Sequence, residues 1–427
     1  MGSDEFKRFE LQSGVLLMVR TRRFLSVMDR MGKSKISRPV GWLLLYLMPV
    51  SAAIGLYLYF MVFQGILSPG FAQASRGIVG LGPLINLGIP GLNPYIPILY
   101  GWVALVVGMV VHEGAHGVIA RSHGLRVKNS GLILLFFVIP IGAFVDIDET
   151  EVRQARKRHA AKMLAAGAGT NLVLAVVCLV VLALVVGSMT PVAIGAGITG
   201  VSKESPAYNR GILPGDIVLA VNGTAVTDLS TILGVNTSLK AGQSLDFTIY
   251  RSGHVIQIDN VTLVCCNQLV NTTTNRVLAE WPYIGVSSVS ASSIRSAVSA
   301  YSDLFNNPFV YIACIPTLDV GRCQGVVPFS SGDSAFYTSP IGAAVLPLAN
   351  QLYWLFFINI NLAIFNSLPI YPLDGGQGFR VGVEALGRGK LSEKTVGRVT
   401  VAATLTVLGF LIAIIAAPYF FVYVLGA

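Results

Sequence analysis

The chain has 427 residues, of which 53% are hydrophobic and only 12% charged, and its formal net charge is +9. This composition excludes an ordinary soluble enzyme, in which about a quarter of the residues are charged. It predicts a polytopic α-helical membrane protein whose positive charge reflects membrane topology and contact with the lipid bilayer, with no nucleic acid as partner.

Five uncharged runs each contain the roughly 20 apolar residues that a transmembrane helix needs. They occupy residues 40–75, 77–111, 163–202, 334–373 and 399–427. We therefore expect about five to six spans.

Lys and Arg residues predict how these spans are oriented. Residues 1–39, 121–162 and 374–398 carry 9, 8 and 5 of them, whereas residues 66–97 carry one and the long segment 188–341 carries seven. By the positive-inside rule, the first three segments are cytoplasmic and the last two extracytoplasmic. We thus expect a cell-membrane protein with a cytoplasmic N-terminus.

These patterns divide the chain into five parts. We expect a cytoplasmic basic segment (1–39), a first membrane part (40–190), an inserted extracytoplasmic domain (194–290), a connector (291–340) and a second membrane part (341–427). Residues 15–31 space apolar side chains among four arginines, which indicates a basic amphipathic helix on the inner membrane surface. A solvated basic arm is the alternative.

The second span ends in His112-Glu113-Gly114-Ala115-His116. In a helix this HExxH pattern sets two imidazoles on one face, where they can hold Zn²⁺ while Glu113 acts on the attacking water. A chance match on a soluble helix is the alternative, but ionisable residues in an apolar span are functional candidates. The pattern predicts metal-assisted hydrolysis near the cytoplasmic side.

Residues 127–148 are apolar in their centre but too short to span, and glycine and proline interrupt them. They predict a re-entrant β-hairpin beside the metal site, whose free edge could hold an extended substrate by strand addition. A hairpin on the protein surface is the alternative.

The third span, 163–186, opens with small residues that allow close helix approach, followed by Asn171. Asn171 is either a satisfied packing residue, a support for a metal ligand or part of a substrate-binding groove. The fourth span ends in Asn366-Ser-Leu-Pro-Ile-Tyr-Pro-Leu-Asp374-Gly-Gly, which must break the helix. Because this span also runs inward, Asp374 can reach the histidines as the third zinc ligand; the alternative is an ordinary Asp-Gly turn.

Residues 197–289 regain charges and short β-rich runs. Their order of Ser205-Pro-Ala, Gly211, Leu213-Pro-Gly-Asp216 and Val221-Asn-Gly resembles a circularly permuted PDZ domain of bacterial-type proteases. The segment Tyr283-Ile-Gly-Val286 is similar to the peptide-carboxylate loop of that family, and a passive domain that binds no peptide is the alternative.

Together, HEGAH, Gly167-Ala-Gly-Thr-Asn171 and Asn366-x-x-Pro-x-x-Pro-x-Asp374-Gly-Gly resemble the site-2 protease family of intramembrane zinc metalloproteases. The resemblance implies zinc bound by His112, His116 and Asp374, Glu113 as general base and then acid, and Asn366 as a substrate-binding residue. A folded extracytoplasmic domain can exclude proteins with bulky outer portions, so we expect the partners to be membrane-protein substrates that have already been cleaved once.

Two other functions remain possible from the residues alone. A membrane receptor or scaffold would bind partners through the PDZ-like domain and keep a structural or silent metal site, although such a site has no need of Glu113. A metal transporter would need ionisable residues along its spans, and the sequence offers none that pass an ion onward.

Overall fold

The computed structural model describes residues 8–12, 15–86, 88–137, 139–234, 238–271, 276–302, 334–387 and 390–426. The chain divides into two compact units, one of Met1–Leu179 with Tyr353–Ala427 and the other of Val180–Leu352. Residues 303–333 of the predicted connector lie outside the described residues.

Five helices in the described residues are long and apolar enough to cross a membrane. They are α2 (Ser37–Ile66), α4 (Ile98–Ser122), α6 (Lys157–Gly187), α11 (Val345–Ser367), which continues the 3-10 helix η5 (Gly342–Ala344), and α13 (Glu393–Tyr423). Each overlaps one of the five uncharged runs, so the predicted multi-pass α-helical membrane protein is confirmed.

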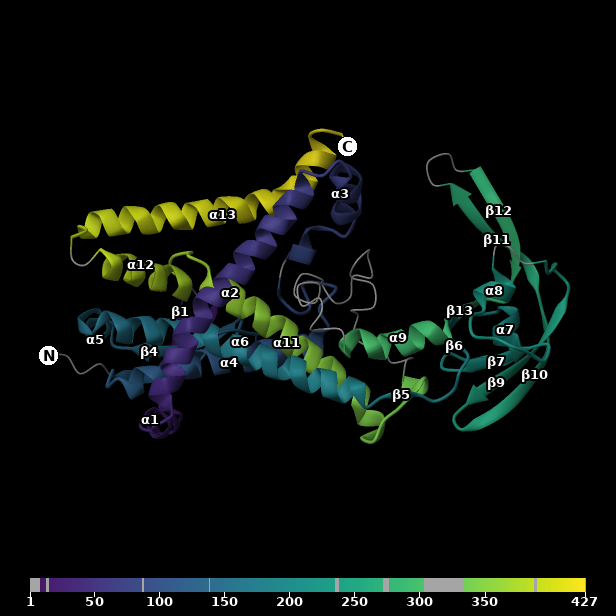
Figure 1. Cartoon of the computed structure of the whole chain (residues 1–427), viewed down its shortest axis with the longest axis horizontal. Helices are drawn as coiled ribbons and strands as arrows, with labels where there is room; N and C mark the ends of the chain where they lie inside the picture. Colours follow the sequence, from purple (N-terminus) through teal and green to yellow (C-terminus); the bar gives the residue numbers. More distant parts are fainter. Residues whose placement is uncertain are drawn as a thin grey trace. The chain divides into compact units, whose positions relative to one another are not determined.

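Shorter helices complete the first unit: α1 (Leu25–Gly32), α3 (Phe71–Gly80), the 3-10 helix η1 (Pro83–Asn86), α5 (Glu149–Gln154) and α12 (Asp374–Leu386). Helix α4 contacts α1 and α2, while α13 packs against α3, α2 and α12 (Figure 1). Apolar side chains bury the faces of α4, with Ala104 packed near Trp354 of α11, and Ile119 near Leu164 of α6. Helix α4 is therefore enclosed by other helices on several faces.

The predicted amphipathic helix over residues 15–31 is wrong in its first half. Residues Leu16–Thr21 form strand β2, and only Leu25–Gly32 form a helix, α1. Strand β2 pairs along its whole length with β3 (Val127–Leu135), from Leu16 opposite Leu135 to Thr21 opposite Ser130. The partner strand, more than 100 positions away, fixes an extended conformation that local apolar spacing does not reveal.

The predicted hairpin over residues 127–148 is present as β3 and β4 (Ile139–Ile147), within a larger sheet than expected. With β1 (Phe9–Gln12), the strand order is β1-β2-β3-β4. Strand β3 thus has a neighbour on both sides. Strand β4 forms the end of this sheet in the described part of the chain.

The second unit is rich in β-structure (Figure 1). Its strands are β5 (Thr190–Pro191), β6 (Ala196–Val201), β7 (Ile217–Val221), β8 (Thr224–Ala225), β9 (Ser244–Arg251), β10 (His254–Thr262), β11 (Val264–Asn271), β12 (Arg276–Tyr283), β13 (Val286–Val289) and β14 (Tyr337–Thr338). The main sheet has the order β10-β9-β7-β6-β13, and α7 (Pro206–Asn209), α8 (Ser230–Leu233) and α9 (Ala291–Ser302) accompany it.

An apolar core and one ion pair stabilise the second unit. Phe247 and Ile249 of β9 are fully buried with Ile198 of β6. The carboxylate of Asp216 is only 1% exposed, and it accepts hydrogen bonds from the Arg251 guanidinium at 2.6 and 2.7 Å. Such a buried carboxylate is stable only when it is paired in this way.

Candidate metal centre

His112 and His116 lie one turn apart near the C-terminal end of α4, and both are 8% exposed. Their ring centroids are 4.9 Å apart, because residues at i and i+4 share a helix face. The potential ligand atoms of His112, Glu113 and His116 all lie within 4.8 Å of one another. The HExxH pattern therefore forms one compact cluster, as the sequence predicts.

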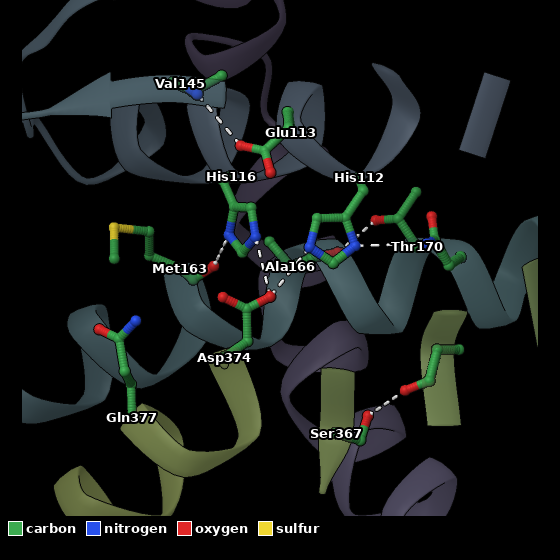
Figure 2. Close-up of polar contacts among 12 residues, drawn as sticks. His112, Glu113, His116, Val145, Met163, Ala166, Thr170, Ser367, Asp374 and Gln377 are labelled. Carbon is green, nitrogen blue, oxygen red and sulfur yellow. Dashed lines mark hydrogen bonds and ion pairs between the residues drawn. The ribbon is translucent and has the colours of Figure 1, made fainter. Parts of the chain in front are cut away.

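Asp374 reaches the same cluster from the first turn of α12 (Figure 2). Its Oδ2 atom lies 3.0 Å from His112 Nε2 and 3.1 Å from His116 Nε2. Ligand atoms at about 2.0–2.1 Å from a tetrahedral Zn²⁺ are roughly 3.3 Å apart, so these three atoms fit a zinc site. The arrangement leaves a fourth position open.

The chain turns from α11 into α12 through residues 368–373, which position Asp374. Thr404 of α13 fastens this loop, because its hydroxyl accepts the Tyr371 N–H at 3.0 Å and donates to the Pro369 carbonyl at 3.3 Å. A Cβ on Gly375 would lie 2.3 Å from the Ser367 carbonyl oxygen, so only glycine allows this close packing. The predicted helix break is confirmed, and α13 supplies one of the anchors of this loop.

Helix α6 passes directly beneath the two imidazoles. A Cβ built on Gly167 would lie 2.4 Å from His112 Nε2 and 2.5 Å from His116 Nε2. The neighbouring Ala165, Ala166 and Ala168 are fully buried. Gly167 therefore keeps open the space in which the three ligand atoms converge.

Each imidazole has a polar neighbour at Nδ1. The Nδ1–H of His116 donates to the Met163 carbonyl oxygen at 2.7 Å, which leaves Nε2 free for a metal. The Asn171 side-chain amide lies 3.3 Å from His112 Nδ1, and its Oδ1 atom is buried without a partner among the described residues. Asn171, which is fully buried, thus contacts a predicted metal ligand.

Glu113 lies between the histidines and β4, and one of its carboxylate oxygens is directed toward Val145 of β4 (Figure 2). Its Oε2 atom accepts the backbone N–H of Val145 at 3.1 Å. This bond holds the half-buried carboxylate beside the histidines and also places β4 next to the cluster.

The structure brings together His112, Glu113, His116 and Asp374, with Asn171 behind them. Asn366 is half-buried near the end of α11, and its side chain makes no hydrogen bond in the part of the chain that the structure describes. Its predicted contact with substrate stays a prediction. The sequence did not predict that the Val145 N–H would bind Glu113 or that the Met163 carbonyl would bind His116, because backbone groups are not distinguished by residue type.

The sequence profile described as "Peptidase family M50" matches residues 100–411, nearly three quarters of the chain. An uncharacterized protein of Methanocaldococcus jannaschii is 22% identical over 93% of this chain and 89% of its own length. A protein of Clostridium perfringens described as a candidate zinc metalloprotease is 23% identical over 74% of this chain and 96% of its own length. The zinc metalloprotease Rip1 of Mycobacterium tuberculosis is 24% identical over 64% of this chain and 82% of its own length.

Proposed function

The chain belongs to peptidase family M50, the site-2 protease family, and is an intramembrane zinc metalloprotease; we propose which of its residues perform the hydrolysis. His112, His116 and Asp374 hold the zinc ion, and Glu113 transfers the protons. The main support is that one carboxylate oxygen from α12 lies 3.0 and 3.1 Å from both Nε2 atoms of α4.

The zinc ion and Glu113 have different roles in the proposed hydrolysis. When bound, zinc lowers the pKa of water to about 7 and polarises the scissile carbonyl. Glu113 accepts a proton from the attacking water and later delivers it to the nitrogen of the leaving peptide strand. Its bond to the Val145 N–H occupies one carboxylate oxygen and leaves the other for this transfer.

Asn171 is a positioning residue in this scheme. If the Asn171 amide is turned by 180°, its Oδ1 accepts the Nδ1–H of His112. This bond gives the buried Oδ1 a partner and leaves His112 Nε2 free to bind the metal. The predicted substrate-binding role of Asn171 is the alternative.

The peptide to be cleaved adds to β4 as an extended strand. Because Val145 N–H points to Glu113 and away from β3, the N–H of Ala143, two residues earlier, points to the same open side. A substrate strand paired there would lie next to Glu113. A transmembrane helix must unwind before cleavage, and an edge strand can accept the backbone groups that unwinding releases.

Residues 194–290 form an extracytoplasmic PDZ-like domain that controls which substrates reach the metal centre. The positive φ angles of Gly215 (+96°) and Gly285 (+82°), both within the quoted PDZ-like motifs, and the buried Asp216 support this assignment. The low count of Lys and Arg in segment 188–341 supports its location. The substrates are then membrane proteins whose outer portion has already been trimmed.

A receptor or scaffold with a silent metal site is not favoured. Family membership and the fixed position of Glu113 both favour catalysis.

Replacing Glu113 by Gln tests the proposed chemistry. We expect cleavage of a purified single-span substrate to slow by about 10²- to 10⁴-fold, while zinc content stays near that of the wild type. Glu393→Gln is the control, because the side chain of Glu393 is 89% exposed at the start of α13. Wild-type turnover by the Glu113 variant would refute the assignment.

A further inference from the structure

A cavity of 990 Å³ lies at one end of the helices of the first unit, apart from the metal centre. The segment after α1, the first turns of α2, the end of α4 and the first turns of α6 line it. Its size is at the upper end of the range for ligand pockets, about 300–1,000 Å³.

The lining is strongly basic. Seven Lys and Arg residues face the cavity, and no Asp or Glu is among the residues that line it. Arg121 is paired with Asp29 at 2.9 Å. The other six form no ion pair with described residues: Lys33, Lys35, Arg38, Arg156, Arg158 and Lys162.

Lys162 distinguishes this cavity from an ordinary basic surface. The residue is only 4% exposed, and its ammonium nitrogen lies 3.8 Å from the centroid of the Trp42 ring. Arg38 and Arg158 are close enough to repel it. Burying a cation without an anionic partner is costly, so the site lacks a counter-charge.

His123 experiences the same positive surroundings. Burial lowers its pKa below the usual value, and Lys162, Arg38 and Arg158 lower it further. The ring of His123 lies against that of His159, with 4.3 Å between their centroids. The lowered pKa favours the neutral form of His123, which adds a hydrogen-bonding group to the cavity lining without a further positive charge.

We propose that this cavity binds a phosphate-bearing anion, and that the headgroup of an anionic lipid is the source its location favours. Lys and Arg donors match phosphate oxygens, which provide the missing charge. The site lies at the start of α2 and α6 and at the end of α4, three helices long and apolar enough to span a membrane, so their spans place it near the membrane surface. Trp42 is a residue type enriched at that interface. Basic pockets between transmembrane helices are suited to lipid headgroups.

Native mass spectrometry of the full-length, delipidated protein tests the proposal with two probes, dioleoylphosphatidylglycerol and dioleoylphosphatidylcholine. We expect the wild type to retain phosphatidylglycerol at least about tenfold more tightly than phosphatidylcholine. Arg38→Gln/Arg158→Gln should lose about tenfold or more of this affinity, since both side chains are exposed and their replacement need not disturb folding. Lys162→Met, which keeps the aliphatic contact with Trp42, should show a similar loss.

Lys394→Gln/Arg398→Gln is the matched control. It removes the same charge from exposed positions at the start of α13, which do not line the cavity, and should change the affinity less than about twofold. Binding of inorganic phosphate, measured at constant ionic strength, shows whether the anion comes from a lipid headgroup or from a soluble phosphate. Phosphate that binds the wild type and not the cavity variants, with no lipid retained, supports the anion site with a soluble ligand. Equal losses in the cavity and control variants, equal retention of both lipids, or no binding of phosphatidylglycerol, phosphatidylcholine or inorganic phosphate would overturn the proposal.

Discussion

The Nε2 atom of His116 lies 3.1 Å from Oδ2 of Asp374, although 258 positions separate the two residues. Two independent features create this approach: the HExxH helix, and the loop that Thr404 and Gly375 hold against the end of α11. The metal centre therefore depends on residues that never touch the metal. Gly167 and Asn171 of α6 are the clearest of these.

Replacing Gly167 by Ala should remove zinc from the protein. The added methyl group would lie 2.4–2.5 Å from both Nε2 atoms and fill the space between the ligands. We expect zinc per chain, measured by elemental analysis, to fall at least about tenfold. Gly114→Ala is the control, because a Cβ at this position inside HExxH has nothing within 4 Å. Full zinc content in the Gly167 variant would mean that the ion is bound elsewhere.

Substitution of Asn171 separates its two proposed roles. Asn171→Leu leaves His112 Nδ1 without its polar neighbour, so zinc affinity should fall by about 10- to 100-fold. Asn171→Asp keeps an oxygen that accepts Nδ1–H and should retain most of the affinity. A competition assay with a chelator measures both. Unchanged zinc affinity with a raised KM for substrate would instead favour the substrate-groove role.

The sequence predicts the parts of this protein whose signals are local. Uncharged runs locate the five long helices, and the residues of HExxH and of the Asp374 loop locate the cluster. The pairing of β2 with β3 is not predictable in this way, because the partner strand decides it. The contacts of the Val145 N–H and the Met163 carbonyl are not predictable from the sequence either, because nearly every residue carries these backbone groups.

Proline at position 143 tests strand addition to β4. Ala143→Pro removes an N–H on the open edge without removing a hydrogen bond to β3, so the sheet should persist. We expect cleavage of a single-span substrate to slow by about five- to tenfold, the effect of one lost hydrogen bond. Ala143→Val, which keeps the N–H, is the control. Equal rates for the two variants, with wild-type zinc content, would exclude pairing at this edge.

Excision of residues 197–289 tests whether the PDZ-like domain controls access. Gly197 and Val289 are paired across β6 and β13, so their Cα atoms are about 5 Å apart and a short Gly/Ser linker can join the cut ends. We expect the excised protein to cleave a short, pre-trimmed substrate at the wild-type rate and an untrimmed substrate faster than the wild type does. The reason is that a folded extracytoplasmic domain can exclude bulky substrates but takes no part in the chemistry.

Zinc content and the short substrate together serve as the control for this experiment, because both report an intact metal centre. Asp216→Ala provides a second variant of full length, in which Arg251 loses its buried carboxylate partner and the domain is destabilised from within. It should relax discrimination in the same direction as excision. If both variants load zinc and discriminate between the two substrates as the wild type does, the domain is passive. If a zinc-loaded excision variant cannot cleave the short substrate, the domain contributes to cleavage itself and is not only a filter.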